Sequence, residues 1–221
     1  MAKLLFIQAS PRTIGSQSQK IAEIYLDTLC TQIPKLEVDT LDLRKENLPA
    51  FDGDKVAAKM NLMTGKVHDA VQKIAWDRII EVASRFISAD RYLFSVPMWN
   101  GGIPYRLKQY IDIIHQPGLT FGLNPESGYI GLLKNKHATL VLTSGAFAQN
   151  RPAPAFGVDH HSTYLRSWLN QAGVSAIDEL RFQPSLVTPD PAGEFERAKQ
   201  EAGRLALTHW RALTGSGGKL Q

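Results

Sequence analysis

Three short segments of this 221-residue chain carry residue types that bind ligands, and each follows an apolar run. The first, 10–18 (Ser-Pro-Arg-Thr-Ile-Gly-Ser-Gln-Ser), directly precedes a helical pattern. Hydroxyls and free backbone N–H groups at a helix N-terminus can hold a phosphate, and Arg12 can add a charge-assisted contact. Ser16 as an N-cap and Ser10 as a turn residue account for the same residues equally well. The segment lacks the glycine and Gly-Lys-Ser/Thr spacings of dinucleotide and nucleoside-triphosphate loops.

The second segment, 96–104 (Val-Pro-Met-Trp-Asn-Gly-Gly-Ile-Pro), joins an apolar run to another helical repeat. Its adjacent glycines, Gly101 and Gly102, allow the backbone to approach a ligand closely, and Trp99 offers a flat aromatic wall. A tight turn with Trp99 packed into the core is the alternative, although two glycines exceed what a turn needs. The third segment, Thr143–Phe147, is another small-residue loop that contains an aromatic.

Strand and helix patterns alternate along the chain, which predicts an α/β sheet. Three runs are nearly continuously apolar and are typical of central strands covered on both faces: 4–7, 92–96 and 138–142. Two runs alternate apolar and polar residues, as edge strands do: 36–41 and 180–182. The first, third and fourth strands are therefore expected to be central, which is a property of the parallel order 2-1-3-4-5.

Amphipathic helical patterns separate these strands, so we expect helices on both faces of a doubly wound sheet. They begin near Ser16, at Val71, after Pro104, at Ser162 and at Phe195. Two stretches, 47–64 and 116–134, do not fit the alternation, and loops of this length are usually functional covers or oligomer contacts. We predict a single domain over residues 1–214 and a flexible C-terminal tail over 215–221.

The bulk composition is that of an ordinary globular protein, with 43% hydrophobic and 21% charged residues. A net charge of +4 without a block of Lys or Arg argues against a nucleic-acid partner. No apolar run approaches membrane-spanning length, and no signal-peptide pattern is present. Cys30 is the only cysteine, so a disulfide is excluded and a cytoplasmic location is the default expectation.

The six histidines do not predict a metal site. His160 and His161 follow Asp159, but adjacent side chains point in different directions and make a poor chelate, so we expect this pair on the surface at a helix start. His137 begins a strand, and His209 fits the packed face of an amphipathic helix. A hydrolase has little support, because no Gly-x-Ser-x-Gly elbow is present.

The three central strands of the predicted sheet end at the same edge. A phosphate-type loop, a glycine–aromatic loop and a second small-residue loop therefore meet there, and they outline a flat ring with a phosphate tail, which is FMN. The chain resembles the FMN-dependent NADH azoreductases, which are also NAD(P)H:quinone oxidoreductases of the flavodoxin-like superfamily, from Leu4 to about Leu213. Its most specific motifs are Ser-Gln-Ser at 16–18, Pro-Met-Trp-Asn at 97–100, Leu-Lys-Gln-Tyr-Ile-Asp at 107–112 and Gly-Leu-Thr-Phe at 118–121.

The resemblance implies a flavodoxin-like fold and a homodimer with two active sites at its interface. It also implies a ping-pong cycle in which NADH or NADPH delivers a hydride to FMN, and a quinone, azo compound or nitroaromatic then takes the two electrons. No side chain is assigned as a catalytic acid or base. The residues implied to bind FMN are Ser10, Arg12, Ser16, Gln17, Ser18, Pro97, Met98, Trp99, Asn100, Gly101, Gly102, Ser144, Gly145, Ala146 and Phe147. The substrate pocket is assigned to Phe121, Leu123, His160 and Gln171.

The chain departs from the family pattern at several of these positions. Gly101 stands where an aromatic is typical, and Ser144–Phe147 where a Ser-Arg-Gly-Gly-like run is typical. Leu123 and Gln171 replace aromatics that cover the flavin in some relatives. We expect these departures to affect substrate preference more than FMN binding.

Other functions are compatible with the same fold. An NADPH-dependent reductase of free FMN or chromate would need the same three loops. A non-enzymatic electron carrier of the flavodoxin type would bind FMN but no nicotinamide, and such carriers are generally small and strongly acidic, unlike this chain. A redox-linked regulatory protein without turnover is a third alternative.

Overall fold

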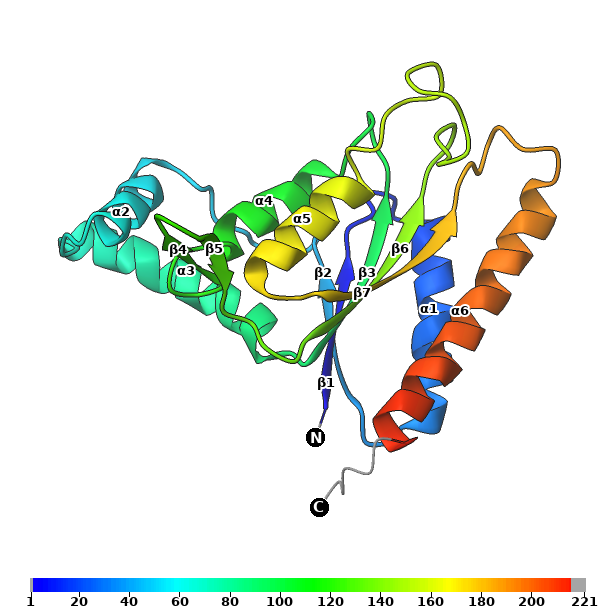
Figure 1. Ribbon diagram of the computed structural model, residues 1–221, viewed down its shortest axis with the longest axis horizontal. Helices are drawn as coiled ribbons and strands as arrows, with labels where there is room; N and C mark the ends of the chain where they lie inside the picture. The colour runs from blue at the N-terminus through cyan, green and yellow to red at the C-terminus, as the bar shows by residue number, and fades with distance from the viewer. Residues whose placement is uncertain (1, 216–221) are drawn as a thin grey trace.

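A five-stranded parallel sheet forms the centre of the computed structural model, which describes residues 2–215 (Figure 1). The strand order is β2-β1-β3-β6-β7, and each neighbouring pair is parallel. Numbered along the chain, the strands of this sheet follow the order 2-1-3-4-5, so the predicted topology is confirmed. The strands are β1 (Lys3–Gln8), β2 (Glu37–Asp42), β3 (Arg91–Pro97), β6 (His137–Thr143) and β7 (Ala176–Phe182).

Burial in the sheet follows the apolar pattern of the sequence. The interior residues of β1, β3 and β6 are buried, whereas β2 and β7 keep partly exposed positions along their length. Continuous apolar runs suit strands covered on both faces, and mixed runs suit the two edges.

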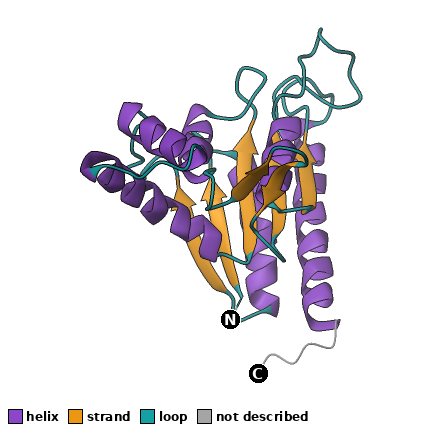
Figure 2. Ribbon diagram, turned by 60° about the vertical axis from the view of Figure 1, so that its left-hand side comes forward, coloured by secondary structure: helices purple, strands orange, loops and turns teal. Residues whose placement is uncertain are grey.

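Helices cover both faces of this sheet, as Figure 2 shows. The side chains of α1 and α6 pack on one face, together with Leu4, Leu93 and Val141. Those of α3, α4 and α5 pack on the other face, together with Leu5, Phe94 and Leu140. The helices are α1 (Gln17–Gln32), α2 (Gly53–Met63), α3 (Ala70–Ser88), α4 (Tyr105–Ile114), α5 (Ser162–Ala172) and α6 (Pro191–Gly215).

The two stretches that did not fit the alternation contain regular structure that the sequence analysis did not predict. Helix α2 lies within the first, and the second forms the antiparallel hairpin of β4 (Phe121–Asn124) and β5 (Gly128–Gly131). Among the residues of α2 only Ala58 is buried, and Met60 and Met63 are 50% and 44% exposed, so no clean apolar face marks this helix in the sequence.

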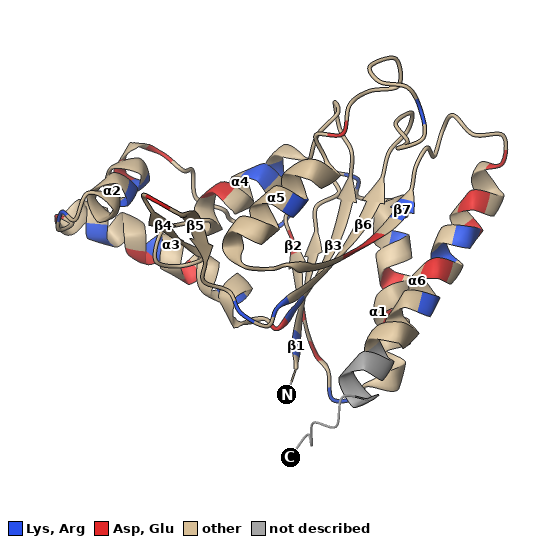
Figure 3. Cartoon of the chain, viewed as in Figure 1, with Lys and Arg blue, Asp and Glu red and all other residues tan. Residues whose placement is uncertain are grey.

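The C-terminal region differs slightly from the prediction, because α6 extends to Gly215. The rest of the predicted tail, 216–221, lies outside the described residues. Charges of both signs alternate along α6 instead of forming a block of one sign (Figure 3). No helix within residues 2–215 combines the length and apolar character that crossing a bilayer requires.

Candidate functional site

A cavity of about 290 Å³ lies where β1, β3 and β6 end. Residues from all three predicted loops line it, and a fourth loop, which follows β7, completes it. The lining residues are Ser10, Arg12, Ser16, Gln17, Pro97, Met98, Trp99, Thr143, Ser144, Gly145, Ser185 and Leu186. The structure therefore brings most of the predicted cofactor-binding positions to one place.

Three serines form a buried hydroxyl cluster where β1 leads into α1. Ser10, Ser16 and Ser18 are 3%, 6% and 0% exposed, and the Oγ atoms of Ser16 and Ser18 lie 3.3 Å apart. Ser16 is the N-cap of α1, since its Oγ accepts the N–H of Gln19 at 3.4 Å. Ser16 therefore both caps α1 and lines the cavity. The first turn of α1 contains no acidic residue, so the positive end of the helix dipole is free to attract an anion.

Arg44 supports this loop from the end of β2 and was not anticipated from the sequence. Its Nη1 donates to the backbone carbonyl of Arg12 at 2.7 Å, while Asp42 binds its Nε and Nη2 at 2.9 and 2.7 Å. These hydrogen bonds hold the pKa of the Asp42 carboxyl below its usual range. The Arg44–Asp42 ion pair therefore braces the backbone of this loop from the end of β2.

The loop after β3 is a tight hairpin turn that presents Trp99. The backbone N–H groups of Trp99 and Gly102 each donate to the other's carbonyl, at 2.9 and 3.0 Å. Asn100 and Gly101 between them have φ values of 50° and 81°, as in a type I′ turn. Trp99 is 45% exposed. The turn alternative is therefore correct for the backbone, but the indole is not packed into the core.

The loop after β6 contributes only part of the predicted set. Ser144 and Gly145 line the cavity, whereas Ala146 and Phe147 do not, and the Phe147 side chain is buried. The Ser144 hydroxyl donates to the backbone carbonyl of Phe147 at 2.5 Å. The N–H of Ser185 donates to the Ser144 carbonyl at 2.7 Å, which anchors the fourth loop to this one.

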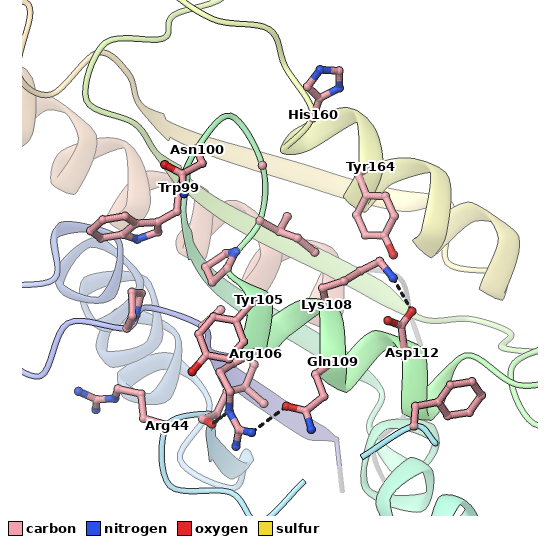
Figure 4. Close-up of a pocket in the computed structure, with 17 residues that line it drawn as sticks. Arg44, Trp99, Asn100, Tyr105, Arg106, Lys108, Gln109, Asp112, His160 and Tyr164 are labelled. Carbon is pink, nitrogen blue, oxygen red and sulfur yellow. Dashed lines mark hydrogen bonds and ion pairs between the residues drawn. The ribbon is translucent and has the colours of Figure 1, made fainter. Parts of the chain in front are cut away.

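A larger cavity of about 1110 Å³ lies beside the first and shares Trp99 with it (Figure 4). Asn100, Gly102 and His160 line this cavity together with the face of α4 that carries Tyr105 and Lys108. The predicted cofactor residues Asn100 and Gly102 thus face this second cavity, and Gly101 and Ser18 line neither one.

Polar side chains on α4 are held in place around this larger cavity. Arg106 donates to the carbonyls of Leu43 and Glu46 and to Gln109, at 3.0, 2.5 and 2.8 Å. Lys108 contacts Asp112 at 2.5 Å. Aromatic side chains and hydrogen-bonded charged side chains therefore line the same cavity.

Within one chain, the four predicted substrate-pocket residues do not line a common cavity. His160 lines the larger cavity, but Phe121, Leu123 and Gln171 line neither cavity. Phe121 is buried against His115, with ring centroids 4.6 Å apart, and Leu123 is 52% exposed on the hairpin. Within a single chain, these three residues belong to the β4–β5 hairpin and α5.

His161 corrects the expectation of a surface histidine pair. It is fully buried, and burial lowers its pKa to about 4, so the imidazole is neutral at pH 7. The neighbouring Asp159 caps α5 by accepting the backbone N–H groups of Ser162 and His161, at 2.8 and 3.1 Å. His161 is thus enclosed by the protein, whereas the adjacent His160 lines the larger cavity.

Comparison with known proteins gives a consistent result. A family model described as a flavodoxin-like fold matches residues 2–205. A protein of Ruegeria pomeroyi, named FMN-dependent NADH:quinone oxidoreductase, is 48% identical over 198 residues, which are 90% of this chain and 97% of that protein. A protein of the same name from Desulfotalea psychrophila is 41% identical over 208 residues, or 93% of this chain and 97% of that protein.

Solved structures agree with the sequence relatives. An azoreductase from Bacillus anthracis superposes with a TM-score of 0.84 at 27% identity, covering 94% of this chain and all of the other. An FMN-dependent NADH-azoreductase of the same species, solved in complex with FMN, gives a TM-score of 0.83 at 25% identity, covering 95% of this chain and 99% of the other.

Proposed function

Since the chain belongs to the flavodoxin-like family, we propose that it is an FMN-dependent NADH:quinone oxidoreductase that also reduces azo compounds. One observation carries this proposal: Ser10 and Ser16 of the buried hydroxyl cluster line the same cavity as the half-exposed Trp99. A phosphate site and an aromatic wall in one cavity match the two ends of FMN. The names of the relatives and the extent of their identity support the same conclusion.

The residues present fit this cofactor. The hydroxyls of Ser10, Ser16 and Ser18 and the N-terminal amides of α1 would hold the phosphate, because each can donate to an anionic oxygen. The backbone around Met98 and Trp99 would line one side of the ring system. When bound, FMN supplies the two-electron hydride chemistry of a ping-pong cycle between a nicotinamide and a quinone, azo or nitroaromatic acceptor.

The chain itself contributes binding, orientation and exclusion of water. The Ser144 hydroxyl donates a hydrogen bond to the backbone carbonyl of Phe147, and His161 is neutral and fully buried outside both cavities. Neither group is placed to exchange a proton with a substrate. Exposed Trp99 marks the boundary between the smaller cavity and the larger one, where a flat nicotinamide or quinone would enter.

The test is an anaerobic titration of the purified yellow protein with NADH, followed at the flavin absorbance maximum. We expect the colour to be lost on mixing and to return when a quinone is added. Free FMN at the same concentration serves as the control for uncatalysed reduction. A flavodoxin-type carrier would stay oxidised, and a reductase of free FMN would lose its flavin on gel filtration and favour NADPH. Colourless protein that takes up no added FMN would refute the proposal.

We further infer a homodimer in which a second copy covers the larger cavity. Tyr105 and Trp99 on its wall are 77% and 45% exposed, which leaves a wide aromatic surface open in one chain. The family resemblance implies a homodimer with two active sites at its interface, which supports this inference. Phe121, Leu123 and Gln171, which line no cavity of their own chain, would then belong to the partner's site.

Sedimentation at micromolar concentration tests the dimer. We expect the wild type to be dimeric and Tyr105→Glu to shift it towards monomer, because a carboxylate would have to be desolvated at the interface. Thr208→Glu, on α6 across the sheet, is the matched control and should remain dimeric. A monomeric wild type would contradict the inference.

The single cysteine supports a cytoplasmic location.

A further inference from the structure

Two histidines and an aspartate that are far apart in the sequence meet at the end of the sheet opposite the two cavities. Nε2 of His137 lies 2.7 Å from Oδ2 of Asp178, and Nε2 of His209 lies 3.0 Å from the same oxygen. All three potential ligand atoms lie within 4.8 Å of one another. None of these residues contributes to the flavin site proposed above.

The strand register and the packing of α6 bring the three residues together. Asp178 pairs with Thr139, and His137 precedes Thr139 by two residues, so the side chains of these three residues share one face of the sheet. Helices α1 and α6 lie on this face (Figure 1). On α6, Ala202 and Ala206 are fully buried against this face, and their small side chains let the helix approach closely. His209 follows Ala206 by three residues and therefore points to the same side.

We propose that His137, Asp178 and His209 bind a divalent transition metal of the zinc class. Imidazole nitrogens and a carboxylate oxygen are ordinary ligands for such ions. Tetrahedral ligands at zinc distances lie about 3.3 Å apart. The two contacts with Asp178, at 2.7 and 3.0 Å, would lengthen slightly to reach this spacing, and the two imidazole ligand atoms, which lie within 4.8 Å of each other, would adjust to the same spacing. The Asp178 side chain is 44% exposed and gives solvent access to a fourth position.

Tyr25 supplies the outer partner that metal-binding histidines usually have. Its hydroxyl lies 2.7 Å from Nδ1 of His209, and the Thr139 hydroxyl donates to the Tyr25 oxygen at 3.4 Å. Tyr25 is 1% exposed, so this contact fixes the imidazole plane with Nε2 directed at Asp178. A ring oriented in advance loses less freedom when it coordinates an ion.

The ring nitrogen of His209 that carries the proton differs between a metal-bound site and a cluster held by hydrogen bonds alone. Without metal, an ionised Asp178 can only accept, so both Nε2 atoms must carry protons, and Nδ1 of His209 accepts from Tyr25. With metal on Nε2, the proton of His209 resides on Nδ1 and is donated to the Tyr25 oxygen. Metal binding therefore exchanges one neutral tautomer for the other.

Arg91 is the neighbouring group that opposes a cation. It pairs with His137 in the register of β3 and β6, and its guanidinium is close enough to act electrostatically on Tyr25 and Asp178. Removing this charge should favour a divalent ion. We therefore expect Arg91→Met to bind metal more tightly than the wild type, an effect that a cluster with only a structural role would not produce.

The experiment uses the untagged, FMN-loaded full chain after treatment with a chelator. Titration with Zn²⁺ by calorimetry, and metal analysis after gel filtration, should give one ion per chain. His137→Gln should weaken binding at least about 100-fold, since a ligand is lost outright. His68→Gln is the matched control, because His68 lies between α2 and α3 and its ring nitrogen bonds only the Ala58 carbonyl, and it should bind as the wild type does.

Two further measurements keep the proposal open to refutation. His209→Gln also loses the contact with Tyr25, so if it fails to fold, His137→Gln decides the outcome. Nitrogen NMR of the imidazoles should show the change of His209 from the Nε2–H to the Nδ1–H tautomer when Zn²⁺ is added. Absence of stoichiometric Zn²⁺ binding, unchanged binding by His137→Gln, or unchanged tautomers in the presence of Zn²⁺ would each overturn the proposal.

Discussion

Ser18→Ala is expected to weaken FMN binding by about 10- to 150-fold, equivalent to roughly 1.5–3 kcal/mol for a lost hydrogen bond to a charged group. The Ser18 hydroxyl is fully buried in the first turn of α1 and lies 3.3 Å from that of Ser16. The substitution removes one donor to the phosphate but leaves the Ser16 cap in place. Titration of the flavin-free protein, followed by quenching of flavin fluorescence, measures the change in Kd.

Two controls isolate the phosphate contribution. Riboflavin has the same ring but no phosphate, so its affinity should be nearly equal in wild type and Ser18→Ala. Ser84→Ala, an exposed helical serine on α3 whose hydroxyl contacts only the Glu81 carbonyl, should bind FMN as the wild type does. Equal FMN affinity in wild type and Ser18→Ala, or an equal loss for riboflavin, would show that the serine cluster does not hold the phosphate.

The serine-rich loop at one end of the smaller cavity could be located from the sequence because its residues are contiguous. Ser16 to Ser18 lie directly before an amphipathic helix, and this local pattern is enough to locate a helix N-terminus. Arg44 could not be predicted in the same way, since only the β1–β2 pairing brings its guanidinium to the Arg12 carbonyl. The fourth loop, with Ser185 and Leu186, was missed for the same reason.

The direction in which loop side chains point could not be predicted from the sequence either. Phe147 and Trp99 both occupy small-residue loops after central strands, yet Phe147 is buried away from the cavity and Trp99 is half exposed. The difference comes from backbone geometry: two consecutive positive φ values turn the β3 loop outward, whereas the Ser144 hydroxyl closes the β6 loop on itself. Composition alone does not distinguish these two arrangements.

The β4–β5 hairpin could not be predicted from the local sequence pattern, because a contact with a segment far away in the sequence holds it in place. Its strands have four residues each and contain several glycines, so they carry little alternation of polarity. What fixes the hairpin is a backbone contact: the N–H of Leu133, just after β5, donates to the carbonyl of Ala172 at the end of α5, at 3.0 Å. That contact requires glycines at two positions that are far apart in the sequence, Gly131 and Gly173.

Gly173→Ala is expected to destabilise the protein by about 2–5 kcal/mol, the largest stability effect that we predict. Gly173 ends α5 with a φ of 99°, in the left-handed region. A Cβ there would lie 2.4 Å from the Leu133 carbonyl oxygen and 3.1 Å from the carbonyl carbon of Gly131, and backbone atoms cannot move aside as a flexible side chain would. Chemical unfolding at a fixed flavin loading measures the loss.

Gly65→Ala is the matched control, because Gly65 has a φ of 70° and a Cβ added there would meet no other atom within 4 Å. It should lose only the cost of the left-handed backbone, about 1–2 kcal/mol. The excess loss in Gly173→Ala then measures the steric overlap between α5 and the chain after β5. If the two variants lose the same free energy of unfolding, β5 can move away from α5 at no cost. The contact with α5 would then not fix the position of the hairpin that carries Phe121 and Leu123.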